Sequence, residues 1–91
     1  MKKNSDFKSA KLILMTSADF TGANLPNYSF RGGNFEGASF RGGSFCGADF
    51  SNANLSNADF SNANLSNANL RGANLRDANF SGANLSGAAF V

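Results

Sequence analysis

The sequence predicts an all-β solenoid, a parallel β-helix in which the chain winds into stacked coils. Three observations support this fold: a period of five in the large apolar residues, a small residue two places before each of them, and turn-forming residues after each of them. A period of five fits neither the 3.6 of an α-helix nor the 2 of a flat strand. In so strict a repeat, each unit buries its apolar side chain only by stacking on copies of itself.

The large apolar residue of each unit, called the centre here, recurs at every fifth position from Phe20 to Phe90. The fifteen centres are Phe20, Leu25, Phe30, Phe35, Phe40, Phe45, Phe50, Leu55, Phe60, Leu65, Leu70, Leu75, Phe80, Leu85 and Phe90. Burying a Leu or Phe side chain contributes about 1.5–3 kcal/mol. We therefore expect the centres from Phe20 to Leu85 to form the structural core.

The two residues before each centre predict a short extended segment. Strand side chains alternate, so the residue two before the centre points inward and the residue one before it points outward. The inward position is Ala in twelve units, Gly33 and Gly43 in two, and Tyr28 in one. Gly33 and Gly43 precede Phe35 and Phe45, so we expect a larger ring to be matched by a smaller neighbour. The outward position is polar in every unit except that of Ala89.

The two residues after each centre predict a corner. A continuous strand with an odd period would swap its faces at every repeat, so the chain must change direction once per unit. The second residue is Gly eight times, Asn five times and Asp77 once in the fourteen complete cases. A type II turn has positive φ at this position, and Pro26-Asn27 matches both of its central positions. We expect type II corners, with types I and IV open at individual units.

The units resemble those of the pentapeptide-repeat family, Ala-(Asp/Asn)-(Leu/Phe)-X-X, from Ala18-Asp19-Phe20 to Ala88-Ala89-Phe90. The resemblance covers about four fifths of the chain. It implies a right-handed quadrilateral β-helix with about four coils of 20 residues, whereas the corners alone also permit three sides. Four units per coil would stack the centres in four columns: Phe20, Phe40, Phe60 and Phe80; Leu25, Phe45, Leu65 and Leu85; Phe30, Phe50, Leu70 and Phe90; Phe35, Leu55 and Leu75.

The two ends of the chain depart from the regular repeat. Residues 1–16 are out of frame, so we expect an irregular N-terminal coil or cap there, or a short helix, followed by the β-helix over 17–91. After Phe90 the sequence offers no helix, Pro or Lys to cover the last coil. An uncovered strand edge invites pairing, so we expect a homodimer through this coil end. The residues expected at the contact are Phe80, Leu85, Phe90 and Val91.

Charge and hydropathy exclude several classes of function. The net charge is +2, but four of the eight bases lie in the first eleven residues and the region from Ser17 onward has one excess negative charge. These values favour neither nucleic-acid nor membrane binding. The longest apolar run near the N-terminus, Leu12 to Met15, is shorter than the roughly 7–15 residues of a secretory segment. We expect a cytoplasmic protein.

The sequence contains no pattern that indicates catalysis, a cofactor or a metal. It has no His to serve as a general base, and the single Cys46 cannot form an internal disulfide. Cys46 stands at a corner, where we expect an exposed thiol. Asp19 and Asp59 share a face about 9.6 Å apart, near the ~6.5–9.5 Å of inverting glycosidases, but a flat solvated ridge lacks a cleft. We predict no catalytic, cofactor-binding or metal-binding residues, and no cofactor.

The predicted function is a non-enzymatic scaffold or protein-interaction module, whose role and protein partner the sequence does not name. The resemblance implies an alternative, because some pentapeptide-repeat proteins mimic duplex DNA and bind type II topoisomerases such as gyrase. A DNA mimic should present dense negative potential along its length. This chain is short, lacks acidic ladders and carries a net positive charge.

Overall fold

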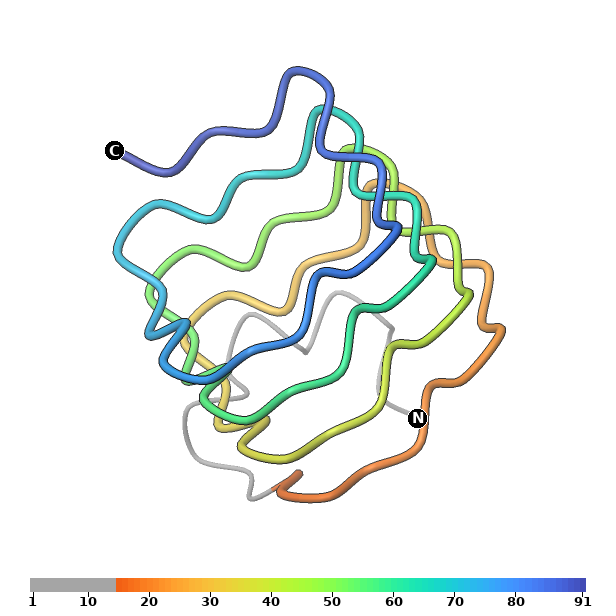
Figure 1. Ribbon diagram of the computed structural model, residues 1–91. Coiled ribbons are helices and arrows are strands. Elements are labelled where there is room, and N and C mark those ends of the chain that lie inside the picture. Colours follow the sequence, from red (N-terminus) through yellow and green to blue (C-terminus); the bar gives the residue numbers. More distant parts are fainter. Residues whose placement is uncertain (1–14) are drawn as a thin grey trace, which may run out of the picture.

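The computed structural model describes residues 15–91, which wind into a solenoid (Figure 1). Within these residues there is no helix and no strand of several residues. Eleven single-residue parallel bridges join each position to the one twenty residues later, from Asp19–Ser39 to Asn69–Ala89. Twenty residues per turn and five per unit give four sides. The right-handed quadrilateral β-helix is thereby confirmed.

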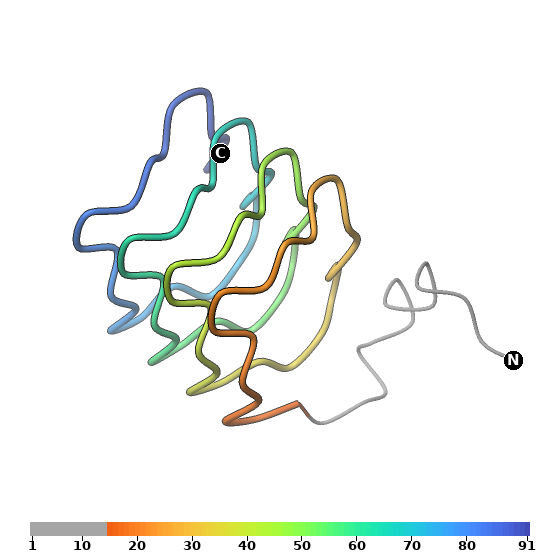
Figure 2. The same ribbon diagram turned by 90° about the vertical axis from the view of Figure 1, so that its right-hand side faces the viewer.

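The coils stack in chain order along one axis (Figure 2). We refer to the partial coil 15–30 and to the coils 31–50, 51–70 and 71–91. Each unit from residue 53 to residue 67 donates three backbone hydrogen bonds to the neighbouring coils and accepts three from them. The Phe60 N–H donates to the Asn79 carbonyl at 2.7 Å and the Asn62 N–H to the Ser81 carbonyl at 2.8 Å, while the Asp59 N–H donates back to the Ala38 carbonyl at 2.9 Å.

The corners have the backbone conformation that the sequence predicts. The second corner residue has positive φ in all fourteen complete units, at 67–72° for the glycines and 59–61° for the asparagines and Asp77. The next residue closes the turn with a hydrogen bond to the preceding centre, as from the Ala53 N–H to the Phe50 carbonyl at 3.1 Å. Asn and Asp tolerate this region better than other side chains, which explains their alternation with Gly.

The core consists of the stacked centres and the alanines beside them. The nine fully buried centres are Phe30, Phe35, Phe40, Phe45, Phe50, Leu55, Phe60, Leu65 and Leu70. The centres that are partly buried are Phe20, Leu25, Leu75, Phe80 and Leu85, all in the outer coils. Every centre of the coils 31–50 and 51–70, which have a described coil on both sides, is fully buried, and Phe30 is the one fully buried centre outside them.

Phenylalanines of one column stack face to face. The ring centroids of Phe40 and Phe60 are 4.6 Å apart with planes 4° from parallel, and those of Phe60 and Phe80 are 5.3 Å apart at 3°. Between columns the rings meet edge to face, as for Phe50 and Phe60 at 5.4 Å and 89°. Both arrangements are favourable for aromatic pairs.

Phe45 stands in a column whose other centres are leucines, and Gly43 makes room for its ring. A Cβ atom on Gly43 would lie 2.5 Å from Phe45 Cε2 and 2.8 Å from the Ala23 carbonyl oxygen. This confirms the expected match between a large ring and a small neighbour at Gly43 and Phe45, while that of Gly33 and Phe35 stays a prediction.

The regular repeat is already present at Met15. Its N–H donates to the Asn34 carbonyl at 3.0 Å, and Ser17 has the positive φ of a corner residue. Residues 1–14 lie outside the described residues. The expected cap, irregular coil or short helix over 1–16, and the boundary before 17, therefore stay predictions.

Candidate interaction surfaces

The outward residue before each centre has a structural role that we did not predict. In ten units its Asn or Asp side-chain oxygen accepts a hydrogen bond from the backbone N–H two residues later, at 2.9–3.2 Å. This arrangement is an Asx turn leading into the corner. Asn24 cannot make it, because Pro26 has no N–H. The frequency of Asn and Asp just before a turn was the signal that could have shown it.

These side chains form four rows, one on each side of the solenoid. The rows differ in charge, because acids occur on two sides only. They are Asp19, Ser39, Asp59 and Asn79; Asn24, Ser44, Asn64 and Asn84; Ser29, Asp49, Asn69 and Ala89; Asn34, Asn54 and Asn74.

The paired acids considered for catalysis are held as carboxylates. Hydrogen bonds from the Thr21 hydroxyl and backbone N–H lower the pKa of Asp19 below its ordinary value, and those from Ser61 lower the pKa of Asp59 in the same way. A lowered pKa suits a carboxylate that accepts hydrogen bonds and is the opposite of what a general acid needs. These two residues serve the turns.

The first corner residues from Cys46 to Ser66 are buried or half-buried, whereas the nine others, such as Arg31 and Arg76, are exposed. Ser51, Ser56 and Ser61 are 6–9% exposed, and Cys46 is half-buried, so the prediction of a freely exposed thiol is wrong. Stacking explains this, because each corner lies between the same corner of two other coils. Ser51, for example, lies between Arg31 and Arg71, twenty residues away on either side.

The described residues offer little for metal or membrane chemistry. Over residues 15–91, no three His, Cys, Asp or Glu side chains gather where they could hold a metal ion. That part of the chain also has no helix long and apolar enough to cross a bilayer.

The coil 71–91 ends in an unpaired rim. Among the described residues, the N–H groups of Leu75, Phe80 and Leu85 have no backbone partner, although the equivalent groups of Leu55, Phe60 and Leu65 bond to the following coil. Phe90 is 41% exposed and Val91 is fully exposed. Of the four residues expected at the contact, Phe80 and Leu85 are partly buried under this rim.

A four-sided solenoid with polar outward rows is the class of protein that this geometry defines. The sequence profile of the pentapeptide repeats matches residues 14–52 and 53–90 with eight copies. The chain therefore belongs to the pentapeptide repeat family.

Solved structures of the family are similar to this chain. The pentapeptide repeat protein Rfr23 from the cyanobacterium Cyanothece 51142 is 30% identical over 84% of this chain, with a TM-score of 0.81. This chain spans about half, 52%, of that protein's length. The pentapeptide repeat protein alr5209 from Nostoc Pcc 7120 is 35% identical over 88% of this chain and 70% of its own, with a TM-score of 0.67. No curated protein matches.

Proposed function

We propose that the chain is a non-enzymatic protein-interaction scaffold that self-associates through the outer rim of the coil 71–91. The rim is the observation that carries this proposal, since it combines unpaired backbone groups with exposed Phe90 and Val91. Members of the pentapeptide repeat family are generally structural or interaction modules, which supports the scaffold part of the proposal.

A second copy of the chain fits this rim in shape. A two-fold axis in the plane of the rim would place each side against a side of equal length running in the opposite direction, as antiparallel pairing requires. Three of the four corners are Gly72, Gly82 and Gly87, which carry no side chain that would hold the copies apart. Only Asp77 interrupts this flat edge.

Charge does not oppose such pairing. The charged side chains of the coil 71–91 are Arg71, Arg76 and Asp77, so the repulsion between two copies is small. Pairing would also cover Phe80, Leu85 and Phe90 with the equivalent residues of the other copy. Apolar burial and backbone pairing would then act together.

Sedimentation velocity over a range of concentrations tests the self-association. We expect the 91-residue chain to dimerise, and both deletion of the last five residues and Phe90→Lys to shift it toward monomer. Asn24→Lys is the matched control, because it adds the same charge at an exposed position far from the rim. A chain that stays monomeric at the highest concentration overturns the proposal, as does equal behaviour of the two Lys variants.

The topoisomerase alternative stays a prediction that no feature of the described residues favours. The acidic residues of this chain are spread over separate sides and corners, and Arg41 and Arg76 stand between them. A gyrase supercoiling assay decides it: activity that is unchanged at high concentrations of this chain excludes a DNA mimic.

A further inference from the structure

On the side of Asn34, Asn54 and Asn74, the Asx turns determine which atoms of each side-chain amide face the corner and which face outward. The side-chain Oδ1 atoms of Asn34, Asn54 and Asn74 accept from the backbone N–H groups of the residues two places on, at 3.1–3.2 Å. A backbone N–H can only donate, so the oxygen of each amide must lie against the corner. The Nδ2 donors are then left for the outer surface. Asn54 Nδ2 also donates to Asn34 Oδ1 at 3.3 Å, which ties the row together.

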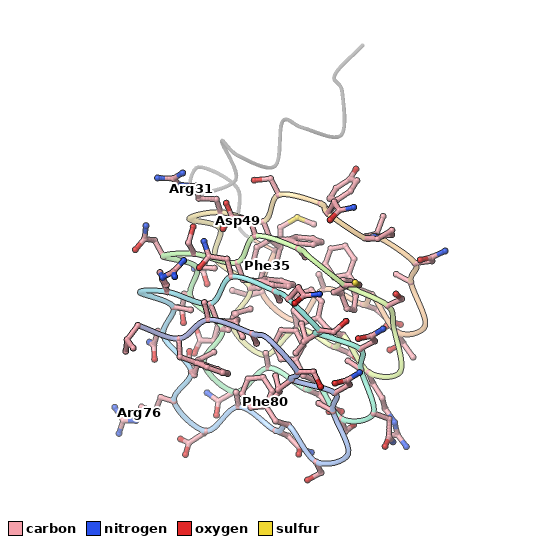
Figure 3. All side chains as sticks on the ribbon, turned by 90° about the horizontal axis from the view of Figure 1, so that it is seen from above. Arg31, Phe35, Asp49, Arg76 and Phe80 are labelled. Atoms are coloured by element: carbon pink, nitrogen blue, oxygen red, sulfur yellow. The ribbon has the colours of Figure 1, made fainter. Side chains whose placement is uncertain are left out.

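Arginines border the same side. Arg31 and Arg71 stand at one corner and Arg76 at the other, all three exposed, and Figure 3 shows Arg31 and Arg76 on one side of the molecule. Arg71 is held in place by a hydrogen bond from Nε to the Val91 carbonyl at 3.0 Å. We call Asn34, Asn54, Asn74, Arg31, Arg71 and Arg76 the arginine–asparagine face.

The surroundings of this face limit the kind of partner. Glu36 and Asp77 lie at the corner with Arg76, and Asp19, Asp49 and Asp59 occupy the two adjoining sides. A long polyanion that wrapped around the solenoid would meet these acids. A short segment that follows the corner of Arg31 and Arg71 and the asparagine row would meet N–H donors and guanidinium groups, with Glu36 and Asp77 at the far corner.

We propose that the arginine–asparagine face binds an acidic, extended peptide segment of another protein. This inference rests on the proposed role as an interaction module and names its partner. Arg31 and Arg71 lie two coils apart, or about 9.6 Å at the backbone. A polyproline II segment repeats its side chains every three residues, about 9.3 Å, so two carboxylates three residues apart would meet Arg31 and Arg71. Arginine–carboxylate pairs would be the strongest contacts.

Fluorescence anisotropy with two labelled peptides tests the proposal. The probe is a twelve-residue peptide of Glu-Pro-Pro repeats, and its control has Gln in place of Glu. We expect the Glu peptide to bind the intact chain at low salt and the Gln peptide to bind at least tenfold more weakly. If the two peptides bind equally, or the Glu peptide does not bind, the proposal fails.

Two matched pairs of variants locate the binding. Arg31 and Arg41 lie in the same coil, each before Gly-Gly, but Arg41 is at the opposite corner of the square. We expect Arg31→Gln to weaken binding about fivefold and Arg41→Gln less than twofold. The second pair is Asn54→Asp and Asn64→Asp, and Asn64 lies on another side. We expect Asn54→Asp to weaken binding more than Asn64→Asp does. Both should fold, because Asp makes the same turn at Asp19, Asp49 and Asp59.

Three outcomes would overturn the inference. Equal losses for Arg31→Gln and Arg41→Gln would indicate general electrostatic attraction. Binding that no variant changes would place the peptide elsewhere, such as on the lysines of the first eleven residues. A single-stranded DNA twelve-mer that binds more tightly, with the same loss on Asn54→Asp, would make the face a nucleic-acid site. Sedimentation of Asn54→Asp should match that of the unmodified chain, so failure here is distinguishable from failure of self-association.

Discussion

The coil 51–70 and the coil 71–91 have nearly the same repeat but very different surroundings. The centres Leu55, Phe60, Leu65 and Leu70 are fully buried and their N–H groups bond to the following coil. The centres of the coil 71–91 are partly buried, up to the 41% exposure of Phe90. The stability of a unit in a solenoid therefore depends on its neighbours at least as much as on its own five residues.

The second corner residues of the two coils differ, and the small residues of one coil lie over the larger residues of the other. All four second corner residues of the coil 51–70 are asparagines, whereas three of the four in the coil 71–91 are glycines. A Cβ atom on Gly72, Gly82 or Gly87 would collide with the side-chain oxygen of Asn52, Asn62 or Asn67. Positive φ favours glycine at these positions, and the missing Cβ also lets the asparagine of the coil before keep its place; over Asn57 the equivalent residue is Asp77, which carries a Cβ.

The largest expected effect sets Phe60→Ala against Phe80→Ala. Phe60 stacks between Phe40 and Phe80, whereas Phe80 has a stacking partner on one side only among the described residues. We expect Phe60→Ala to lower the free energy of unfolding by about 3–5 kcal/mol and Phe80→Ala by about half of that. Urea denaturation followed by circular dichroism measures both.

Protein concentration sharpens this test. If copies pair through the coil 71–91, Phe80 becomes covered and the cost of Phe80→Ala should rise with concentration, while that of Phe60→Ala should not. Equal costs for the two variants in dilute, monomeric solution would contradict the contrast between the coils.

The next effect compares Gly72→Ala with Gly42→Ala. Both glycines have positive φ, but a Cβ on Gly42 meets no heavy atom within 4 Å, whereas one on Gly72 collides with Asn52. We expect about 1–2 kcal/mol of loss for Gly42→Ala from backbone strain, and up to about 1 kcal/mol more for Gly72→Ala, because the Asn52 side chain has to move. Thermal unfolding measures the difference. In an Asn52→Gly background the two costs should become equal, and a difference that persists there would show that Asn52 is not its cause.

Much of the fold could be predicted from the sequence, because the same five-residue pattern occurs in fifteen consecutive units. The period of five located the centres from Phe20 to Phe90, and Gly, Asn or Asp77 after them located their positive φ values; the earlier corner at Ser17 was not among them. The number of sides could not be derived this way, since corners fix where the chain turns and not by how much. It came from the resemblance to the family, and the twenty-residue bridges confirm it.

Contacts between coils were the part that sequence reasoning missed. Burial of Ser51 and collision of Asn52 with a Cβ at Gly72 arise between residues twenty apart, which a unit-by-unit analysis does not compare. The Asx turns were missed for another reason. An Asn or Asp at an outward position satisfies the expectation of a wet face, so its second role as a turn acceptor did not stand out.

A smaller effect is expected at the outward row, from Asn54→Ala against Asn74→Ala. Asn54 accepts from the Ser56 N–H and hydroxyl at 3.1 and 2.8 Å and donates to Asn34, whereas Asn74 makes one exposed bond to the Arg76 N–H. We expect losses of about 1–3 kcal/mol for Asn54→Ala and about 0.5 kcal/mol for Asn74→Ala. Urea denaturation measures them, and Asn54→Asp should restore only the part that comes from the two Ser56 bonds, because a carboxylate cannot donate to Asn34. Equal costs would mean that the bonds between coils add nothing.

The smallest expected effect is the loss of stability at low pH, and it too differs between the two coils. Hydrogen bonds from Ser61 lower the pKa of Asp59 from its ordinary value of 3.8, while the same row has the uncharged Asn79 in the coil 71–91. A carboxyl whose pKa is lower in the folded state stabilises the fold above its unfolded pKa and loses that contribution as the pH falls through the folded value.

The melting temperature should therefore be flat above about pH 5 and fall below about pH 4. Asp59→Asn keeps the turn acceptor, as Asn54 and Asn64 do, but cannot be protonated. We expect this variant to show a smaller fall between pH 4 and pH 2 than the unmodified chain, and Asp19→Asn to act in the same direction, because the pKa of Asp19 is also lowered. A fall of unchanged size in both variants would assign the acid response to other carboxyls, and the Asx turns would then be indifferent to the charge of their acceptor.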